Sequence, residues 1–373
     1  MNKDLSWCRT RIDEIDEKLM ALFEERMTIV LDVARYKKEN NLPIFNKVRE
    51  DEVIEKNLNR INNEALKAHA ENMLHSLMDI SKDYQCENIG VREVPLSKGR
   101  EIKVGYQGVP GSFSDEALIK YFGKDYSGKA FEEFEDVFTA LKFNAIDYGV
   151  LPIENSTTGS ITKNYDLLKK YGFHIVGEVL VKIEHNLLGI KGSDIKDIEE
   201  IYSHSQAFEQ SSDYLNSLGS EVKLIPHHNT AISAKYISEL SDKKKAAIGS
   251  LRAAEIYGLD VLKEHINNAL ENYTRFIIVG RDFETNELCN KITISFTLDN
   301  KAGNLYNKLK VFSDNNINLR KIESRPMGNG HFDYYFYIDL DGNISDDAVK
   351  SSLDLLEKDS KDYKLLGAYR REE

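Results

Sequence analysis

Along the first part of the chain, residues 8–86, apolar residues recur at intervals of three and four. This spacing places them on one face of an α-helix. It predicts one uninterrupted helix over about 8–40, which ends before Pro43 because the residue preceding a proline is pushed out of the α region. A second helix is predicted from about Lys47 and a third over roughly 64–85. This part of the chain is therefore expected to be all-helical.

The pattern changes beyond the polar segment 87–100, whose two glycines and one proline are typical of a linker. From Glu101 to about Gly280, short runs rich in β-branched and aromatic residues alternate with amphipathic helical stretches. Such alternation predicts an α/β domain with mainly parallel sheets. The expected strands are IKVGY, DYGVLPI, HIVGEVLV, EEIYSH, EVKLIP, AAIGS and TRFIIVG.

Residues 291–370 repeat these signals on a smaller scale. Strands are expected at KITISFTL, INLRKIESRP, HFDYYFYIDL and YKLLGAYR, with helices from about Gly303 and Ser345. The order strand–helix–strand–strand–helix–strand is that of an α+β ferredoxin-like domain. The chain is thus predicted to be multidomain, with three domains over residues 1–90, 101–282 and 290–373.

The composition limits which binding partners and which cellular compartment we expect. The 373 residues include 62 acidic and 50 basic side chains, and a net charge of −12 argues against nucleic acid or an anionic membrane as partner. The three cysteines, Cys8, Cys86 and Cys289, are too widely spaced for a disulfide framework or a zinc site. The N-terminal segment has no apolar signal-peptide core, and no window approaches ~18 continuous apolar residues. We expect a cytoplasmic protein without a metal.

The predicted first helix carries cations within an apolar stripe. Its residues at steps of three and four have the spacing of a coiled-coil seam: Arg9, Ile12, Ile15, Leu19, Leu22, Arg26, Ile29, Val33 and Lys37. A helix of ~33 residues is ~50 Å long, more than so small a domain can cover, so a second copy of the chain is expected to cover it. Arg9 and Lys37 can lie in water at the ends of the stripe. Arg26 lies in its middle, where a buried guanidinium is costly unless an anion compensates it.

The third predicted helix ends its apolar face, Met73 and Leu77, with two neutral hydrogen-bonding side chains, Ser81 and Gln85. Together with the cations of the first helix, they suit a small dicarboxylate. These features resemble the all-helical class of chorismate mutases, a three-helix fold that dimerises through its long first helix. Carried over by position, the family's chorismate-binding set is Arg9, Arg26, Lys37, Asn46, Arg49, Glu50, Ser81 and Gln85.

The resemblance implies roles for these residues. Arg26, and Arg9 from a partner chain, would hold the two carboxylates of chorismate. Lys37 and Gln85 would be catalytic, next to the ether oxygen that gains negative charge as its C–O bond breaks. Such a rearrangement needs a held conformer and stabilised charge, without a nucleophile or base. Asn46 stands where family members often have aspartate, so the hydroxyl contact there would run through backbone or an amide.

Polar residues lie at the ends of three predicted strands. Glu154–Ser160 follows DYGVLPI and opens a helix, Ser203–Gln210 follows EEIY, and Tyr273–Phe276 begins TRFIIVG. Polar residues between a strand and a helix N-terminus are where α/β folds bind anions. The same residue types also cap helices for structural reasons. Thr274 could likewise be an ordinary β-branched strand residue, and Arg275 a solvated edge charge.

With the glycine-rich stretch Gly105–Ser114, these motifs resemble prephenate dehydratases over residues 101–282. The resemblance implies two α/β lobes, like those of a periplasmic binding protein, with the site in the cleft between them. By position, Thr274 is the residue on which dehydration depends. The prephenate-binding residues would be Asn155, Ser156, Ser203, Gln210, Arg275 and Phe276.

The reaction asks little of the protein. Prephenate becomes aromatic when its ring carboxylate leaves as CO₂ and its hydroxyl as water, so a positioned proton or hydrogen-bond donor at that hydroxyl suffices. Thr274 is predicted to be that donor, and Arg275 to help orient a substrate carboxylate. His204 is an alternative donor, although a helix-capping role suits it equally. The chain shows no Walker A or nicotinamide fingerprint, so no cofactor is expected.

Two short motifs characterise the third segment. Ala302–Leu305 lies at a strand-to-helix turn, and Glu323–Pro326 ends a strand. On structural grounds alone, Gly303 would only permit a tight turn and Ser324 only satisfy an amide. The motifs resemble those of phenylalanine-responsive ACT domains, with Asn304 in place of the usual alanine. The resemblance implies L-phenylalanine as effector, bound by Gly303, Asn304, Leu305, Glu323 and Ser324.

Taken together, the three resemblances imply a homodimeric or larger enzyme of phenylalanine biosynthesis that makes prephenate from chorismate and phenylpyruvate from prephenate. One alternative is a mutase fused to a prephenate dehydrogenase, but the glycines of GYQGVPGSF lack the Gly-x-Gly-x-x-Gly spacing. Another is a ligand-binding regulatory protein without catalysis, since two-lobed folds and ACT domains also occur in such proteins. The cations of the first helix and Thr274 argue against it.

Overall fold

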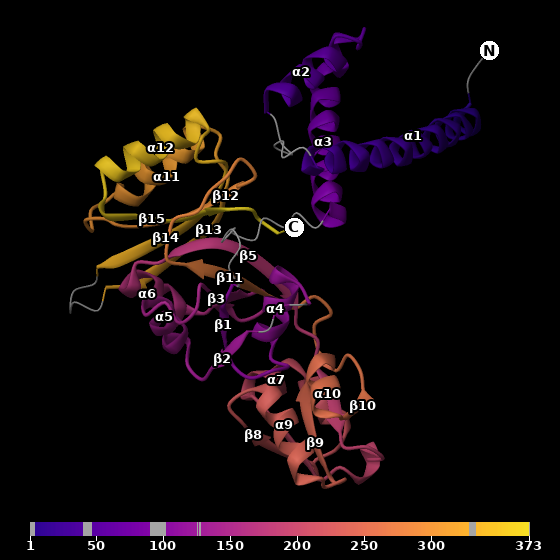
Figure 1. The fold of residues 1–373 in the computed structure, drawn as a ribbon, viewed down its shortest axis with the longest axis vertical. Helices are drawn as coiled ribbons and strands as arrows, with labels where there is room; N and C mark the ends of the chain where they lie inside the picture. Colours follow the sequence, from indigo (N-terminus) through magenta and orange to yellow (C-terminus); the bar gives the residue numbers. More distant parts are fainter. Residues whose placement is uncertain are drawn as a thin grey trace. The chain divides into compact units, whose positions relative to one another are not determined.

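The computed structural model describes residues 4–39, 47–89, 102–124, 126, 128–327 and 333–372. The chain forms two compact units, Met1–Leu96 and Ser97–Glu373 (Figure 1). The first unit is helical and the second contains three β-sheets.

The first unit consists of α1 (Leu5–Glu39), α2 (Lys47–Leu58) and α3 (Lys67–Ile89), with a 3₁₀ turn, η1 (Glu64–Leu66), before α3. Both α1 and α2 pack against α3. Met27, Ala34, Ile54 and Met78 are buried in this small core. The three predicted helices are confirmed. α1 begins three residues before the predicted 8–40 and ends one residue before its end, and α3 begins and ends a few residues after the predicted 64–85.

The apolar stripe of α1 is uncovered within one chain. Six of its aliphatic side chains are between 40% and 63% exposed: Ile12, Ile15, Leu19, Leu22, Ile29 and Val33. Since contiguous apolar surface of this kind is rare on a soluble monomer, it marks an interaction face.

In the second unit, the first lobe is built on a sheet with the order β2–β1–β3–β11–β5, and β4 pairs with β3. α4 packs on the face opposite that covered by α5 and α6. The bounds are β1 (Val104–Gln107), α4 (Phe113–Phe122), β2 (Lys129–Phe131), α5 (Phe134–Lys142), β3 (Tyr148–Asn155), β4 (Gly159–Ser160), α6 (Thr162–Tyr171), β5 (His174–Lys182) and β11 (Tyr273–Gly280).

The second lobe has its own sheet, ordered β10–β6–β9–β7–β8. Its elements are β6 (Asn186–Gly189), η2 (Ile195–Asp197), β7 (Glu200–Ser203), α7 (Ser205–Gln210), α8 (Ser212–Ser217), β8 (Lys223–Pro226), α9 (Thr230–Leu240), β9 (Lys245–Gly249), α10 (Leu251–Tyr257) and β10 (Asp260–Lys263). The chain crosses between lobes twice, after β5 and before β11. The predicted two-lobed α/β architecture is therefore present.

The sheets are mixed, whereas the sequence predicted mainly parallel ones. β11 runs antiparallel to both β3 and β5, and β6 runs antiparallel to both β9 and β10. The cause is the double crossing, because β11 returns from the second lobe and enters the first sheet from the opposite end.

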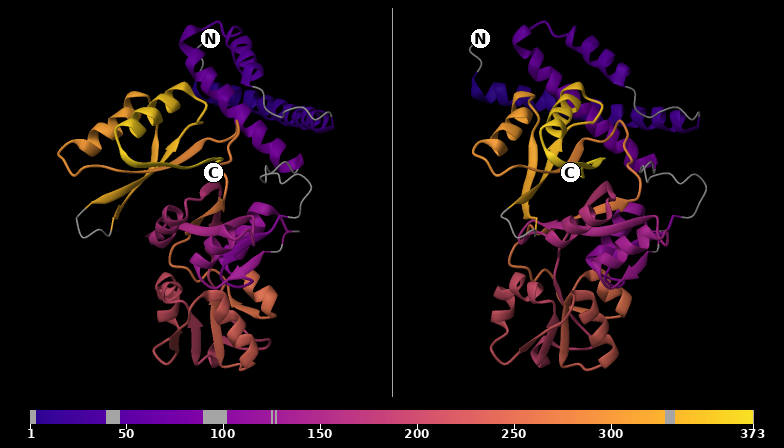
Figure 2. Two further views of the ribbon diagram at one scale, coloured as in Figure 1. Left: turned by 60° about the vertical axis from the view of Figure 1, so that its left-hand side comes forward. Right: turned by 90° about the vertical axis from the view of Figure 1, so that its left-hand side faces the viewer.

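The C-terminal part of this unit has the predicted ferredoxin-like order. β12 (Lys291–Thr297), α11 (Asn304–Asp314), β13 (Leu319–Pro326), β14 (Tyr334–Asp341), α12 (Asp347–Lys358) and β15 (Lys361–Tyr369) form an antiparallel sheet ordered β13–β14–β12–β15. Both views of Figure 2 place the first lobe between this sheet and the second lobe.

The C-terminal sheet approaches the first lobe closely. A Cβ on Gly367 of β15 would lie 2.1 Å from the carbonyl oxygen of Ile175 in β5, so only glycine fits there. β15 of the C-terminal sheet thus packs directly against β5 of the first lobe.

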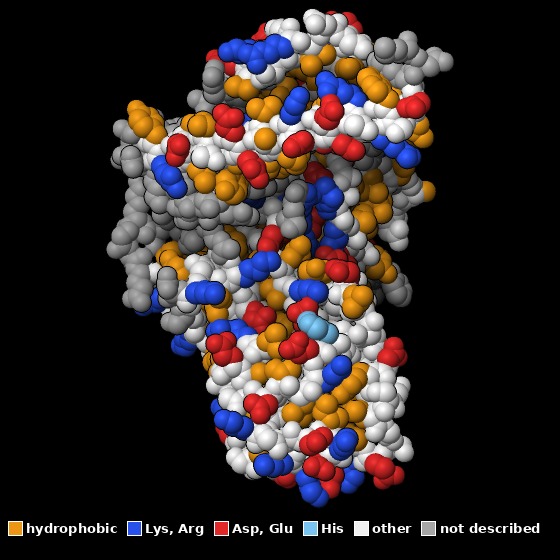
Figure 3. All heavy atoms as spheres, turned by 90° about the vertical axis from the view of Figure 1, so that its right-hand side faces the viewer, with side chains coloured by type: hydrophobic (Ala, Val, Ile, Leu, Met, Phe, Trp, Pro, Cys, Tyr) orange, Lys and Arg blue, Asp and Glu red, His pale blue; other side chains and the backbone are white. Residues whose placement is uncertain are grey.

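The described surface carries both signs of charge. The face in Figure 3 intersperses Lys and Arg with Asp and Glu, with hydrophobic side chains between them. None of the described helices has the length and apolar character needed to span a bilayer.

Candidate functional sites

Arg26 and Ser81 meet between α1 and α3. The Arg26 guanidinium donates to the Ser81 hydroxyl and, over 3.4 Å, to the Leu77 carbonyl. Burial lowers the pKa of Arg26, although the group remains a cation at neutral pH. The arrangement fits a guanidinium that is held in place for an anion.

Most of the other predicted chorismate-binding residues lie outside the described part of the chain. Arg9 is exposed on α1. Lys37, Arg49, Glu50 and Gln85 lie on helices, but their side chains are outside the described part of the chain, as is all of Asn46. Only Arg26 and Ser81 of this set are therefore brought together by described contacts.

In the dehydratase-like region, Thr274 lies directly opposite Asn155 where β11 pairs with β3. The Asn155 amide nitrogen donates to the Thr274 hydroxyl oxygen over 3.0 Å. Both residues are 7% exposed. Because the hydroxyl oxygen accepts this hydrogen bond, the single proton of Thr274 stays available for donation to a ligand.

Asn155 is itself held by the segment that follows it. Its amide oxygen accepts from the backbone nitrogens of Thr157 and Thr158, both over 3.0 Å, and its nitrogen also donates to Asn272 over 2.8 Å. Ser156 adds a reciprocal pair with Tyr273: its backbone nitrogen donates to the Tyr273 carbonyl, and its hydroxyl accepts from the Tyr273 nitrogen. The polar motif after β3 therefore fixes the orientation of Thr274.

The two lobes meet through the glycine-rich motif. The Ser250 hydroxyl, which caps α10, donates to the Gly111 carbonyl over 3.1 Å, and Arg252 pairs with Asp115 over 2.7 Å. Gly111 has φ +84°, and a Cβ there would lie 2.9 Å from the Cα of Ala253. The motif therefore needs glycine both for its backbone conformation and for the close approach of the lobes.

The second lobe's predicted residues have different surroundings. Ser203 is fully buried and donates to the Ile248 carbonyl over 3.1 Å. Gln210 contacts His185, with 2.8 Å between its amide oxygen and the ring Nε2. His204 accepts from the Gln206 nitrogen as the cap of α7, which favours the capping role. The described contacts join neither Ser203 nor Gln210 directly to Thr274.

Two polar groups were missed in the sequence. His185 is almost fully buried against Phe113, and burial lowers its pKa. Glu116, in the first turn of α4, lines a pocket of about 410 Å³ with Lys182 and Arg252. Burial raises the pKa of Glu116 to about 7; Asp115 adds to the shift and Arg252 opposes it. The signal for His185 was a histidine just after a predicted strand, whereas an acidic first turn of a helix gave none for Glu116.

Arg275 and Phe276 are not brought to Thr274 by side-chain contacts. The Arg275 side chain points away from the Thr274 face of the sheet, and three carboxylates surround its guanidinium: Glu154, Glu178 and Asp339. Successive side chains of a strand face opposite sides of its sheet, which explains the separation. Phe276 is buried in the core at 2% exposure. Neither position therefore supports the expected contact with prephenate.

The predicted effector-binding residues fall into two groups, one around α11 and one on β13. Asn304 and Leu305 line a hollow of about 90 Å³ with Tyr334 and Phe336. Gly303 has φ +81° and precedes α11, so its turn requires a left-handed backbone. The remaining two lie on β13 and do not line this hollow, although Ser324 pairs in register with Phe336, which does: Ser324 is exposed, whereas Glu323 accepts a hydrogen bond from Ser160 over 2.6 Å.

Two family models match the chain. Chorismate mutase type II matches residues 8–86, and prephenate dehydratase matches residues 104–284. No group of three or more potential metal ligands gathers among the described residues.

Relatives cover either the whole chain or its larger part. The bifunctional chorismate mutase/prephenate dehydratase of Aquifex aeolicus is 31% identical over 98% of both chains. An arogenate dehydratase/prephenate dehydratase from Arabidopsis thaliana is 38% identical over 72% of each chain.

Solved structures match the larger part. A prephenate dehydratase from Arthrobacter aurescens in complex with L-Phe is 30% identical, with a TM-score of 0.67 over 72% of this chain and 90% of that one. GqqA, described as a quorum-quenching acylase, is 28% identical with a TM-score of 0.67 over 72% of this chain and 98% of its own.

Proposed function

The chain belongs to the family of bifunctional chorismate mutase/prephenate dehydratases, and on this basis we propose how its sites divide the work of phenylalanine biosynthesis. It has a chorismate mutase domain and a prephenate dehydratase domain. The first converts chorismate to prephenate, and the second releases water and CO₂ from prephenate to give phenylpyruvate. The setting is the cytoplasm.

The mutase site uses Arg26 as its central anion holder. A carboxylate of chorismate binds the guanidinium that Ser81 orients, and Arg9 of a second chain holds the other carboxylate. The exposed stripe of α1 supports this homodimer, because one chain leaves it uncovered. Lys37 and Gln85 stabilise the ether oxygen in the transition state.

The dehydratase site uses Thr274 as the hydrogen-bond donor to the leaving hydroxyl. The hydrogen bond from Asn155 to the Thr274 oxygen is the observation that carries this proposal. It fixes the hydroxyl and leaves its proton for the substrate. Departure of the ring carboxylate as CO₂ supplies the electron pair that expels the hydroxyl, so a positioned donor lowers the main barrier.

The C-terminal domain is an ACT module that binds L-phenylalanine and inhibits dehydration. The hollow beside Asn304 and Leu305 supports a site there, and the L-Phe complex of the Arthrobacter relative supports the ligand. Inhibition requires that the bound arrangement of the domain differ in its affinity for prephenate or its turnover.

The two active sites are tested by crossed substitutions. Thr274→Val keeps the shape and removes the hydroxyl, so kcat for prephenate should fall by about 10²- to 10⁴-fold while mutase activity stays normal. Arg26→Ala should do the reverse. Thr274→Ser, which retains a hydroxyl, is the control and should keep substantial activity. Normal dehydration by a folded Thr274→Val protein would refute the assignment.

A further inference from the structure

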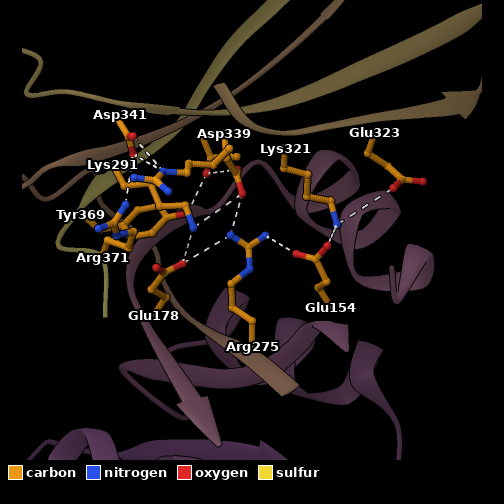
Figure 4. A network of polar contacts seen from close by, with 12 residues as sticks. Glu154, Glu178, Arg275, Lys291, Lys321, Glu323, Asp339, Asp341, Tyr369 and Arg371 are labelled. Atoms are coloured by element: carbon orange, nitrogen blue, oxygen red, sulfur yellow. Dashed lines mark hydrogen bonds and ion pairs between the residues drawn. The ribbon is translucent and has the colours of Figure 1, made fainter. Parts of the chain in front are cut away.

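Six charged side chains form a cluster between the first lobe and the C-terminal sheet (Figure 4). They are three cations and three carboxylates: Glu154, Glu178, Arg275, Lys291, Lys321 and Asp339. Arg275 is at the centre, 2.6 Å from Asp339 and 3.3 Å from each of Glu178 and Glu154. Lys291 is 2.8 Å from Glu178. The charges balance, and each cation joins the first lobe to the C-terminal sheet.

The centre of the cluster is shielded from water. The side chains of Glu178, Asp339, Lys291 and Arg275 are all at most 9% exposed. Burial alone would raise the pKa of Asp339, but Arg275 and Lys291 hold it below its ordinary value. Ion pairs that are buried in this way resist rearrangement, because a buried charge without a partner costs free energy.

On the first lobe, the cluster holds the two strands at the position of the catalytic hydroxyl. Thr274 pairs with Asn155 across β11 and β3, and the next pair in the register is Arg275 with Glu154. A β-bulge follows Arg275, which locally bends the strand. The Asn155–Thr274 hydrogen bond therefore lies on one face of the sheet, and the ion pair Arg275–Glu154 lies immediately behind it.

On the C-terminal sheet, the cluster draws on three neighbouring strands. Lys291 is on β12, Lys321 on β13 and Asp339 on β14, and Lys321 and Asp339 are directly paired. Lys321 contacts Glu154 over 2.8 Å and donates to Ser160 over 2.7 Å. A shift of this sheet must therefore move the partners of both Arg275 and Glu154.

We propose that this ion cluster is the element through which the C-terminal sheet sets the position of the Thr274 hydroxyl, with Arg275 and Asp339 as positioning residues. The proposal adds a mechanism to the phenylalanine response and rests on the proposed donor role of Thr274. It differs from a purely structural role, because a structural contact affects only the fraction of folded protein, whereas a positioning contact affects the turnover of the folded enzyme.

The direct test is Asp339→Asn, which keeps the side-chain shape and removes the charge that faces Arg275. In the full-length folded protein, kcat for prephenate should fall about tenfold to a hundredfold, the effect of a small misplacement. KM should change little, because Thr274 acts mainly in the transition state. Chorismate mutase activity of the same protein should stay at the wild-type value and serves as an internal standard.

Asp341→Asn is the matched control. Asp341 is two residues along the same strand, and its ion pairs with Arg320 and Arg371 lie within the C-terminal domain. This variant should keep wild-type kcat. If Asp339→Asn does not fold, Lys321→Met at the edge of the cluster replaces it, with the same expected fall in kcat.

Measurements with L-phenylalanine distinguish the positioning role of the cluster from the proposed sensor role of the C-terminal domain. In wild type, saturating L-phenylalanine should reduce dehydration about 5-fold or more. In Lys321→Met the reduction should disappear, while calorimetry still detects L-phenylalanine binding. Wild-type kcat in a folded Asp339→Asn or Lys321→Met protein overturns the positioning role. Absence of binding to wild type would instead overturn the sensor, and the kcat measurements would still decide the inference.

Discussion

Glu116 should make the stability of the second unit depend on pH. Its carboxyl lies in the first turn of α4, one of its oxygens has no hydrogen-bond partner among the described atoms, and burial raises its pKa to about 7 from an ordinary value of 4.5. Below pH 4.5 the group is protonated in both the folded and unfolded states. Between pH 4.5 and 7 only the unfolded state ionises, so the free energy of unfolding falls as the pH rises.

The size of the effect follows from that difference. Each pH unit between 4.5 and about 7 corresponds to 1.36 kcal/mol, which gives a total of about 3 kcal/mol. The stabilisation is fully present below pH 4.5 and is lost above pH 7. Glu116→Gln removes this ionisation. The free energy of unfolding of the variant minus that of wild type should therefore be about 3 kcal/mol larger at pH 8 than at pH 4.5.

The assay must report the second unit alone. Cys289 is a buried cysteine of this unit, so the labelling of its thiol after equilibration in urea reports the unfolding of the unit. A brief labelling pulse at one common pH, with the site read by mass spectrometry, gives midpoints for samples equilibrated at each pH. Glu255→Gln is the control, because Glu255 lines the same pocket but is exposed.

Two results would refute the reasoning. One is a parallel pH dependence of wild type and Glu116→Gln between pH 4.5 and 8. The other is an equal change in Glu255→Gln, which would assign the effect to the pocket's overall charge rather than to the buried carboxyl.

Two further substitutions test the closure of the lobes and the effector site. Gly111→Ala should raise KM for prephenate and lower the melting temperature, because its Cβ would meet Ala253. Gly219→Ala is the control, since Gly219 also has a positive φ (+96°) but has open space around it. This control should show only the backbone strain of a left-handed residue, about 1–2 kcal/mol. Equal effects of the two would rule out a role for close approach of the lobes. Ser324→Ala should weaken L-phenylalanine binding in calorimetry while kcat without effector stays normal, since Ser324 is exposed on β13 and takes no part in the ion cluster. Unchanged binding would remove Ser324 from the effector site.

Periodicity predicted the elements that are long enough to show it. The three helices of the first unit and the order of the C-terminal domain follow the expected pattern. β2, β4, β6 and β10 were not predicted. Strands of two to four residues give little alternation to distinguish them from loops, although β1, β7 and β8, of four residues each, were predicted. Strand direction was also predicted poorly, because the sequence does not record which strand β11 pairs with.

One part of the candidate site could be predicted from the sequence, namely two motif residues that contact each other in the structure. Asn155 and Thr274 were identified from motifs 119 residues apart, and they are hydrogen-bonded. The sequence did not predict the ion pairs of Arg275. Strand alternation already indicated that it faces away from Thr274. Its partner Asp339 is 64 residues further along the chain, and no local pattern links the two.

This alternation changes how activity losses at motif residues should be interpreted. In β11, Thr274 faces the proposed site and Arg275 the ion cluster; in β13, Ser324 faces solvent and Glu323 contacts the first lobe. Each short motif therefore combines a residue suited to a ligand with a neighbour that docks one domain on another. Loss of activity in an Arg275 variant would not by itself identify a contact with prephenate. A matching loss in Asp339→Asn, which acts from the other domain, would assign the effect to positioning.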